Sequence, residues 1–424
     1  MLSSMKSLFR KSSRSFTLLA LASLLLSTSC SKEDNGPSTP PSPITTPTTL
    51  TTALTEIYQN ADAPGFAVSV VKNDAIIYQQ TFGQANIEQN RPYSNQTIQA
   101  IGSISKTFVA AAIVKAIEQG HFTLETNIND ILPIELVNPK QADRPILVKH
   151  LVTHTSGLLD NIEVYLAGYH ILPGEDLSGT GAQLLQEALG ASQRTTAELD
   201  DFLAEYYLED GDLYTLNNFG VNDPGVAWNY SNIATSLAAY LVETATGIDF
   251  RTYVTIHILE PLGMSHTAYD VSELDPQQVA TLYWDKNTPL PNYFHESYPD
   301  GSLMTSNEDL SKYLVDMMKG IKGQSSTLFS PAGYELLFTS LLPNGVVPAN
   351  FAKNQGVFWY LDDNTVQHSG ADPGTTCILE FDRSGESGYF LLSNMDQSTE
   401  EHSAAWRQFS AKVEQAINAF IQAN

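Results

Sequence analysis

A serine and a lysine three positions apart, Ser103 and Lys106, have the residue types and the spacing that covalent catalysis requires. They begin a segment whose apolar residues recur with helical spacing, so both side chains are expected on one face of a helix. A serine hydroxyl is a weak nucleophile until a neighbouring base takes its proton. A lysine amine can be that base only when burial or a nearby cation lowers its pKa enough to keep it neutral. The pair predicts nucleophilic catalysis, although Ser-x-x-Lys alone is common by chance.

Two later segments contain groups that would complete such a site. Tyr230-x-Asn232 falls where a loop leads into a predicted helix, and His368-x-Gly370-Ala371 falls at the end of a predicted strand. A tyrosine hydroxyl can relay a proton to a leaving group, and an asparagine amide can orient a substrate carbonyl. A small residue at a strand edge lets a backbone N–H approach a ligand closely. Each segment is a weak signal, but the ordered set of three is a strong one.

The elements that must position these residues are strands near both ends of the chain and helices between them. Residues 66–71 and 75–82 are apolar, β-branched runs around a short turn, which predicts a hairpin. Helical spacing follows over residues 102–120. Further strands are predicted at 356–361, 375–381 and 389–392, and an amphipathic helix at 399–422. We therefore expect an α+β fold, in which one antiparallel sheet built from N- and C-terminal strands is flanked by helices and a mostly helical region is inserted in the middle.

The three motifs together resemble those of the penicillin-recognising serine hydrolases. The nearest branch contains the class C β-lactamases, the D-alanyl-D-alanine carboxypeptidases and the family VIII esterases, and other members carry Ser-x-x-Lys with Ser-Asp-Asn and Lys-Thr-Gly. Here Tyr-Ser-Asn is the second motif, and histidine replaces lysine in the third. The segments His150–Leu158, Pro261–Met264 and Asp300–Thr305 add to the resemblance, which runs from Leu54 to the C-terminus. It implies a β-lactamase/transpeptidase-like fold.

The resemblance also implies a catalytic role for each residue of a triad. Ser103 would be the nucleophile that becomes acylated, and Lys106 would take its proton. Tyr230 would pass a proton to the leaving group and help to activate the water that removes the acyl group. The implied mechanism requires no metal and no organic cofactor.

Four further residues would bind the substrate if the resemblance holds. Asn232 would hold the substrate amide and the lysine ammonium, and the backbone N–H of Ala371, beside Gly370, would form an oxyanion hole with that of the serine. His368 would supply the positive group that faces a substrate carboxylate. A histidine is only partly charged near neutral pH, so a β-lactam with a carboxylate would be held less firmly.

The substrate is not specified by these residues. The resemblance implies a small-molecule or peptide substrate, such as a D-Ala-D-Ala-type peptide from a peptidoglycan stem, a β-lactam or a small ester. A penicillin- or peptide-binding sensor with little turnover is the alternative, and the intact triad favours the enzyme. His150 and His154 have a zinc-like spacing, but Leu151 stands where a metalloprotease has its glutamate, so we predict no metal site.

The composition excludes a nucleic-acid partner. The 424 residues carry 22 Lys plus Arg against 47 Asp plus Glu, a net charge of −25 at pH 7, and no basic stripe offsets this field. With only two cysteines, Cys30 and Cys377, the chain has no disulfide framework and no Cys-x-x-Cys zinc motif. Cys377 falls in a predicted strand and is expected to be a small core residue.

The first residues have the features of an export signal. Basic residues precede an apolar run of 11 residues, Phe16–Leu26, which is shorter than the about 20 residues that span a bilayer. Small residues then lead to Cys30, a pattern that resembles a bacterial lipoprotein signal. We expect a signal peptide at residues 1–29, lipidation of Cys30, and an exported lipoprotein of the cell envelope, attached to the membrane by its lipid alone. The oligomeric state is not specified.

The domain boundaries follow from composition and from the positions of the motifs. Residues 30–53 are rich in Ser, Thr and Pro, which predicts an extended tether. Residues 54–424 are expected to form the hydrolase domain, with the helical insertion at about 100–350. Residues 159–223 form a long stretch between two motifs and are interpreted as a lid that shapes the acyl-donor pocket.

Overall fold

The computed structural model describes residues 43–424, and the predicted N-terminal hairpin is present in it. Strands β1 (Gly65–Lys72) and β2 (Ala75–Asn86) pair antiparallel. The turn residues Asn73 and Asp74 have φ angles of 49° and 66°, in the left-handed region that these two residue types tolerate. The hairpin therefore has suitable turn chemistry.

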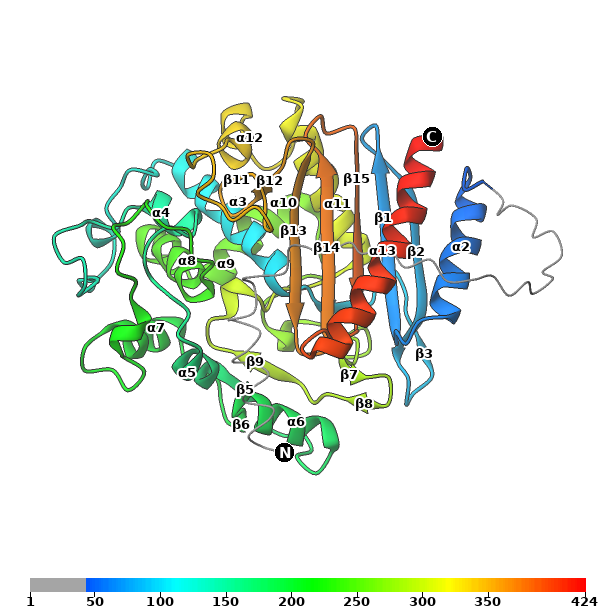
Figure 1. Cartoon of the computed structure of the whole chain (residues 1–424), viewed down its shortest axis with the longest axis horizontal. Coiled ribbons are helices and arrows are strands. Elements are labelled where there is room, and N and C mark those ends of the chain that lie inside the picture. Colours follow the sequence, from blue (N-terminus) through cyan, green and yellow to red (C-terminus); the bar gives the residue numbers. More distant parts are fainter. Residues whose placement is uncertain (1–42) are drawn as a thin grey trace, which may run out of the picture.

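The strands from the other end of the chain complete the sheet. Strands β13 (Thr365–Asp372), β14 (Thr375–Asp382) and β15 (Ser387–Ser393) form an antiparallel meander, and β15 pairs with β1. The full order is β11-β12-β13-β14-β15-β1-β2-β3, with eight strands and antiparallel pairing throughout (Figure 1). The predicted α+β fold, with one sheet assembled from both ends of the chain, is confirmed.

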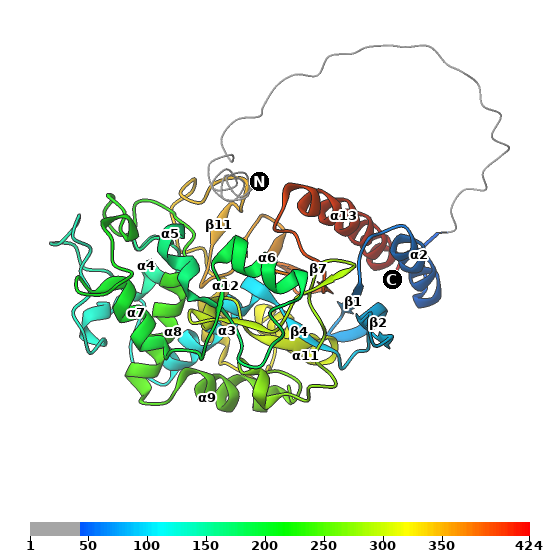
Figure 2. The ribbon, with the colours of Figure 1, turned by 90° about the horizontal axis from the view of Figure 1, so that it is seen from below.

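Both faces of this sheet are buried, which explains the continuous apolar run in β1. Phe66, Val68 and Val70 pack under helices α2 (Pro47–Gln59) and α13 (Glu400–Ala423), whereas Ala67 and Val71 face the larger core. Figure 2 shows α2 and α13 together on one side of the sheet and the remaining helices on the other. The N-terminal and C-terminal helices thus cover the same face.

The second face supports the inserted region. Helices α3 (Ser105–Glu118), α11 (Asn307–Ile321) and α12 (Pro331–Phe338) pack there, and α8 (Asn232–Thr246) packs on α3. The insertion also contains short strands, among them β4 (Ile98–Ala100) with β10 (Met304–Ser306), and β5 (Tyr169–Ile171) with β6 (Ser192–Gln193) and β9 (Tyr293–His295). Shorter helices include α4 (Val148–Val152), α5 (Ile162–Tyr165), α6 (Thr180–Leu189), α7 (Leu199–Tyr207), α9 (Phe250–Val254) and α10 (Glu260–Leu262).

The predicted boundary between tether and domain is wrong. Helix α2 begins at Pro47, inside the stretch interpreted as a tether, because Thr46 forms a capping box with Thr49 and proline occupies the first turn. Leu50 is fully buried and belongs to the core under α13. The Thr-rich composition hid an amphipathic helix whose apolar positions are few but regularly spaced.

The strand predicted at residues 356–361 is also wrong in its extent. Only β12 (Tyr360–Leu361) is a strand there, and it pairs with β11 (Asn354–Gln355). The connection between them turns sharply, and Phe358 has a φ of 57°. Because the Phe358 and Trp359 side chains are fully buried, packing keeps an apolar segment in a tight turn.

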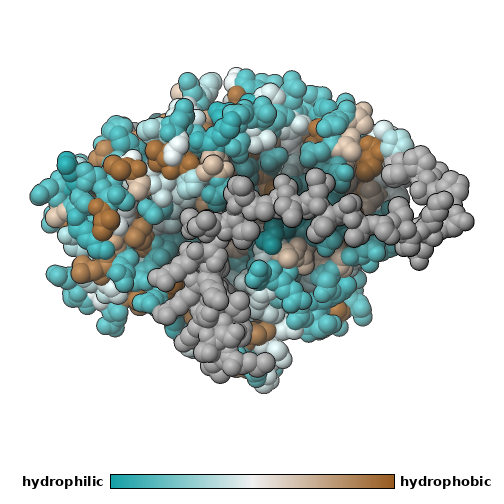
Figure 3. All heavy atoms as spheres, viewed as in Figure 1, coloured by the Kyte–Doolittle hydropathy of each residue, from teal (hydrophilic) through white to brown (hydrophobic). Residues whose placement is uncertain are grey.

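Residues 1–42, with the predicted signal peptide, Cys30 and most of the predicted tether, lie outside the described residues. Among residues 43–424, no helix is both long and apolar enough to span a bilayer. On the face drawn in Figure 3, hydrophilic residues predominate and apolar residues lie in small separate groups.

The buried position of Leu50 gives a test of the corrected boundary. We expect Leu50→Ala to lower the free energy of unfolding by about 2–4 kcal/mol, because it removes a fully buried leucine from the core between α2 and α13. Urea unfolding measures this loss. Thr52→Ala, at an exposed position of the same helix, is the matched control and should change stability by less than about 0.5 kcal/mol. Equal, small effects of both changes would show that α2 does not contribute to the folded core.

Candidate active site

The structure places Ser103 in a turn just before α3. A single 3-10 turn, Gly102–Ile104, leads into the helix, which itself begins at Ser105. Ser105 donates to the carbonyl of Gly102 at 2.7 Å and accepts from the N–H of Leu303 at 3.1 Å, which ties the turn to the inserted region. The serine therefore lies between the sheet and the helical region, at the N-terminal end of a long buried helix.

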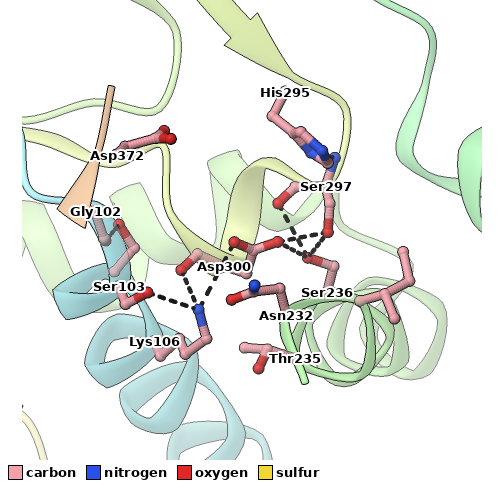
Figure 4. Close-up of polar contacts among 12 residues, drawn as sticks. Gly102, Ser103, Lys106, Asn232, Thr235, Ser236, His295, Ser297, Asp300 and Asp372 are labelled. Carbon is pink, nitrogen blue, oxygen red and sulfur yellow. Dashed lines mark hydrogen bonds and ion pairs between the residues drawn. The ribbon is translucent and has the colours of Figure 1, made fainter. Parts of the chain in front are cut away.

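Lys106 lies in the first turn of α3 and is fully buried. Its Nζ is 3.2 Å from Oγ of Ser103, donates to the carbonyl of Asp300 at 2.7 Å, and lies 3.7 Å from Oδ1 of the same aspartate (Figure 4). Burial lowers the pKa of Lys106, and the nearby Asp300 carboxylate opposes this shift. The amine is thereby brought closer to the neutral form that a general base needs.

Tyr230 approaches the serine from the other side. Its hydroxyl donates to Oγ of Ser103 at 2.8 Å, and Nζ of Lys106 lies 5.0 Å from the centroid of its ring. Burial raises the pKa of Tyr230, so the side chain is a phenol at neutral pH and can donate a proton. The two groups predicted to assist the nucleophile thus converge on a single oxygen atom.

Asp160 and His154 hold the segment that carries Tyr230. The Asp160 carboxylate caps α8, accepting from the N–H groups of Asn232 at 2.9 Å and Ile233 at 3.1 Å. Burial raises the pKa of Asp160 to about 6, and these two backbone donors oppose the shift. The ring of His154 packs 4.6 Å from that of Tyr230. Neither residue contacts Oγ of the serine, so both act as positioning residues.

Asn232 lies at the first position of α8, beside Lys106 and Asp300 in Figure 4. Among the described residues its side-chain amide has no hydrogen-bond partner, and the lysine is bonded to Asp300 instead. The Oδ2 atom of Asp300 accepts from Tyr165 at 3.0 Å and from Ser297 at 2.6 Å. The hydrogen bond expected between Asn232 and the lysine is therefore absent from the described part of the chain, and Asp300 binds the lysine in its place. The Asn232 amide is available to bind a ligand.

His368 lies within β13 and is buried, with a ring stacked on Tyr360 at 5.0 Å. Burial lowers the pKa of His368 to about 3, with a further contribution from the Lys106 charge, and the bond between Nδ1 and the carbonyl of Ser369 opposes the shift. The expectation of a partly charged histidine needs correction, because this imidazole is neutral near pH 7. Without a ligand, it therefore offers no positive charge to a substrate carboxylate.

Gly370 and Ala371 bring the edge of β13 against the serine turn. Beyond Gln367, β13 has no partner on the side of β12. A Cβ atom at Gly370 would lie 1.9 Å from the carbonyl oxygen of Ile101, and one at Gly102 would lie 2.5 Å from the backbone nitrogen of Ala371. Only glycine permits this approach, which brings the backbone of β13 near Ala371 into close contact with the turn that carries Ser103.

The other residues considered from the sequence lie elsewhere. Nδ1 of His150 accepts from the N–H of Leu147, and Nδ1 of His154 accepts from the N–H of Ser231, so both imidazoles serve the local backbone. Cys377 is a buried thiol in β14, and burial raises its pKa to about 12. Among residues 43–424, no three His, Cys, Asp or Glu side chains are grouped as metal ligands.

Sequence reasoning missed the three carboxylates that surround the lysine, those of Asp160, Asp300 and Asp372. All three act on the Lys106 charge, and all come from different loops or strand ends. Asp300 begins a segment that carried part of the resemblance, which is a signal that could have found it. The other two aspartates lie in no sequence motif that could have identified them, because their effect on Lys106 depends on burial and on contacts between distant segments.

The chain is similar to known proteins over most of its length. The family model described as Beta-lactamase matches residues 50–412. PbpX of Bacillus subtilis (strain 168) is 25% identical over 355 residues, which cover 82% of this chain and 74% of PbpX. The matched range includes every residue described in this site.

Two solved structures are similar in fold. The octameric penicillin-binding protein homologue from Pyrococcus abyssi has a TM-score of 0.64 and 25% identity, covering 85% of this chain and 76% of that one. A class C β-lactamase has a TM-score of 0.61 and 17% identity, covering 86% and 96%, and this likeness shows the fold alone. The β-lactamase/transpeptidase-like fold expected from the motifs is confirmed.

Burial and the Asp300 carboxylate shift the pKa of Lys106 in opposite directions, which predicts how the reactivity of Ser103 depends on pH. The Asp300 carboxylate raises the pKa of Lys106, so Asp300→Asn should lower it further. Since the neutral amine exists above its pKa, we expect the acid limb of the profile for Ser103 labelling by a fluorophosphonate to move to lower pH. The control is Ser297→Ala, which removes a hydrogen bond to the same carboxylate and leaves the charge in place. An acid limb that stays in place in a folded Asp300→Asn variant would contradict this assignment.

Proposed function

Since the chain belongs to the β-lactamase family, we propose that it is a serine hydrolase that forms an acyl-enzyme on Ser103 and cleaves an amide or ester. The observation that carries this proposal is the convergence of Nζ of Lys106, at 3.2 Å, and Oη of Tyr230, at 2.8 Å, on the serine oxygen. A binding protein without turnover has no need of a buried base and a buried proton donor at one hydroxyl.

Acylation follows from these contacts. Oγ of Ser103 attacks the carbonyl carbon of the substrate while its proton passes to the neutral amine of Lys106. The carbonyl oxygen becomes an oxyanion, stabilised by the backbone N–H groups of Ser103 and Ala371. When the intermediate collapses, the bond to the leaving group breaks and the leaving group takes the Tyr230 proton. The ammonium of Lys106 then gives a proton to the resulting phenolate, so both side chains regain their starting states.

In deacylation the same groups act again, with a water molecule as the nucleophile and the serine as the leaving group. A water molecule attacks the ester carbon, and its proton passes to the base of the Lys106 and Tyr230 pair. The ester bond to Ser103 breaks, and the serine oxygen regains its proton from that pair. The free acid leaves, and the three side chains return to their starting states.

The uncharged His368 favours certain substrates of this class. A β-lactam or a C-terminal peptide presents a carboxylate, which this imidazole cannot neutralise. Ester turnover, or cleavage of a peptide that lacks a carboxylate at this position, is therefore favoured over efficient β-lactam hydrolysis. We place this activity in the bacterial cell envelope, because the N-terminal sequence resembles a lipoprotein signal ending at Cys30.

Active-site labelling tests the proposed hydrolase. We expect a fluorophosphonate to label Ser103, with the adduct located by peptide mass spectrometry, and Ser103→Ala to remove the labelling. Tyr230→Phe should slow ester turnover by about 10²–10⁴-fold, the usual contribution of a general acid or base. Ser105→Ala, at the neighbouring hydroxyl, should leave the adduct at residue 103. A folded protein without any adduct would overturn the hydrolase and favour a binding protein.

The neutral state of His368 predicts how penicillin and ester compare. We expect the ratio of acylation rates by a fluorescent penicillin and by an uncharged ester to have the same pH dependence, within about twofold between about pH 5 and pH 8, in the native protein and in His368→Asn protein. Both reagents need Lys106, so its titration cancels from the ratio. Asp160 and Asp372, whose pKa values burial raises to about 6 and about 7, titrate in the same range, so His368→Asn is the control. A rise of the ratio at low pH that His368→Asn abolishes would show that the histidine becomes charged, against the effect of its burial.

A further inference from the structure

A small, mostly apolar cavity lies next to segments that flank the serine turn in sequence. Its volume is about 60 Å³, and it is lined by apolar residues that include Leu172, Leu282, Leu290, Tyr293, Phe294 and Met304. Its wall also contains Ala100, three residues before the serine, and Ser302, two residues after Asp300. The cavity thus adjoins the segments that carry the nucleophile and the lysine partner, and it has room for about four water molecules or a small chemical group.

One acidic side chain, Asp372, stands in this apolar wall. In a strand, alternate side chains point to the same face, so Asp372 shares a face of β13 with Gly370. That face is directed at the serine turn, because a Cβ atom at Gly370 would lie 3.0 Å from the backbone nitrogen of Ser103. Figure 4 shows Asp372 at the end of the strand, beside Gly102. The carboxylate is therefore on the face of β13 that is turned toward the segment carrying Ser103.

The Asp372 carboxylate accepts a hydrogen bond from a neutral group, and the only cation that acts on it, Lys106, does so without an ion pair among the described residues. Oδ1 accepts from the hydroxyl of Tyr169 at 2.8 Å, and the described residues place no lysine or arginine in an ion pair with it. Burial raises its pKa to about 7, the Tyr169 hydrogen bond opposes this, and the Asp300 charge adds to it. A half-buried carboxylate among apolar side chains is costly without a counter-ion, and structural packing alone would favour an uncharged residue.

We propose that Asp372 and the adjoining cavity form a subsite for a protonated amine on the acyl half of the substrate. The preferred substrates would be amides or esters of amino acids or peptides with a free ammonium next to the scissile carbonyl. The position of Asp372 directly after Ala371, whose N–H would bind the oxyanion, puts the carboxylate within reach of a group on the carbon next to that carbonyl. The apolar lining would take a short side chain.

Tyr169 and Tyr293 would orient this carboxylate. Tyr169 belongs to the segment 159–223, and Tyr293 lies on β9, which pairs with β5 of that segment. Tyr293 donates to the carbonyl of Pro373 at 2.8 Å, which fixes the chain just after the aspartate. The long stretch between two motifs thereby supplies one wall of the subsite, in keeping with a role in shaping the acyl-donor pocket.

The test compares two acyl donors that differ at one group, and it rests on the proposed hydrolase activity. We would measure kcat/KM for the 4-nitroanilide of 2-aminobutyric acid and for that of 2-methylbutyric acid, both enantiomers of each. In this pair an ammonium is replaced by a methyl group of similar size. We expect the ammonium-bearing donor to be preferred, and Asp372→Asn to lower its kcat/KM by about 10- to 100-fold, the range of one charge-assisted hydrogen bond.

Two controls separate this effect from a general loss of activity. Asp372→Asn should lower the ratio of kcat/KM for the ammonium donor to kcat/KM for the methyl donor by about 10- to 100-fold, because a shift in the pKa of Lys106 affects both donors alike and only the ammonium loses an ion pair. Asp363→Asn removes one negative charge at an exposed surface position, and it should leave kcat/KM unchanged for both donors. Equal losses on both donors, or no loss on the ammonium donor, would overturn the subsite.

Binding without turnover distinguishes the two proposals. In Ser103→Ala protein, 2-aminobutyramide should bind by calorimetry, and Asp372→Asn in the same background should weaken binding by at least about tenfold. Equal binding by the two proteins, or binding by neither, would overturn the subsite even if Ser103 is acylated. Binding that depends on Asp372 would support the subsite even if fluorophosphonate labelling failed, in which case only the hydrolase proposal would fall.

Discussion

The chemistry of this site depends on one constraint, the burial of the Lys106 amine. An ammonium in an apolar interior is costly, and a neutral amine there is a competent base. The protein keeps Lys106 between these limits, since burial lowers its pKa while the Asp300 carboxylate, 3.7 Å away, raises it. The carbonyl of Asp300 also accepts from Nζ at 2.7 Å, so the amine is held in place for either charge state. Every other group of the site is arranged around this atom.

The antiparallel sheet is what brings those groups together. Because β1 pairs with β15, the C-terminal strands lie next to the N-terminal hairpin, and the free edge of β13 reaches the turn before α3. The inserted region then returns over the same turn, with α8 packed on α3 and capped by Asp160. Three segments that are remote in sequence therefore meet around the turn that carries Ser103, and none of them could form the site alone.

Much of this arrangement could be predicted from sequence. The hairpin, the C-terminal helix and the origin of the sheet at both ends follow from local periodicity, and the ordered motifs identified Ser103, Lys106 and Tyr230, which the fold brings together. The charge of His368 and the partner of Asn232 could not be predicted. They depend on burial among side chains from distant segments, which no local pattern encodes. Helix α2 was missed because threonine is its commonest residue and a Pro-rich stretch precedes it, although its cap and its two buried leucines determine its structure.

The charges around the site all favour a cationic ligand over an anionic one. Asp160, Asp300 and Asp372 act on the single buried cation, while His368 and His154 are neutral because burial lowers both pKa values. A site with three carboxylates and one titrating amine, in a chain of net charge −25, presents a negative potential to an incoming ligand. Such a potential repels a substrate carboxylate and attracts an ammonium. In the proposed hydrolase, the absence of charge on His368 and the position of Asp372 would have the same consequence. Selectivity would arise on the acyl side of the scissile bond, where a cation can be neutralised, and not on the side where a β-lactam presents its carboxylate.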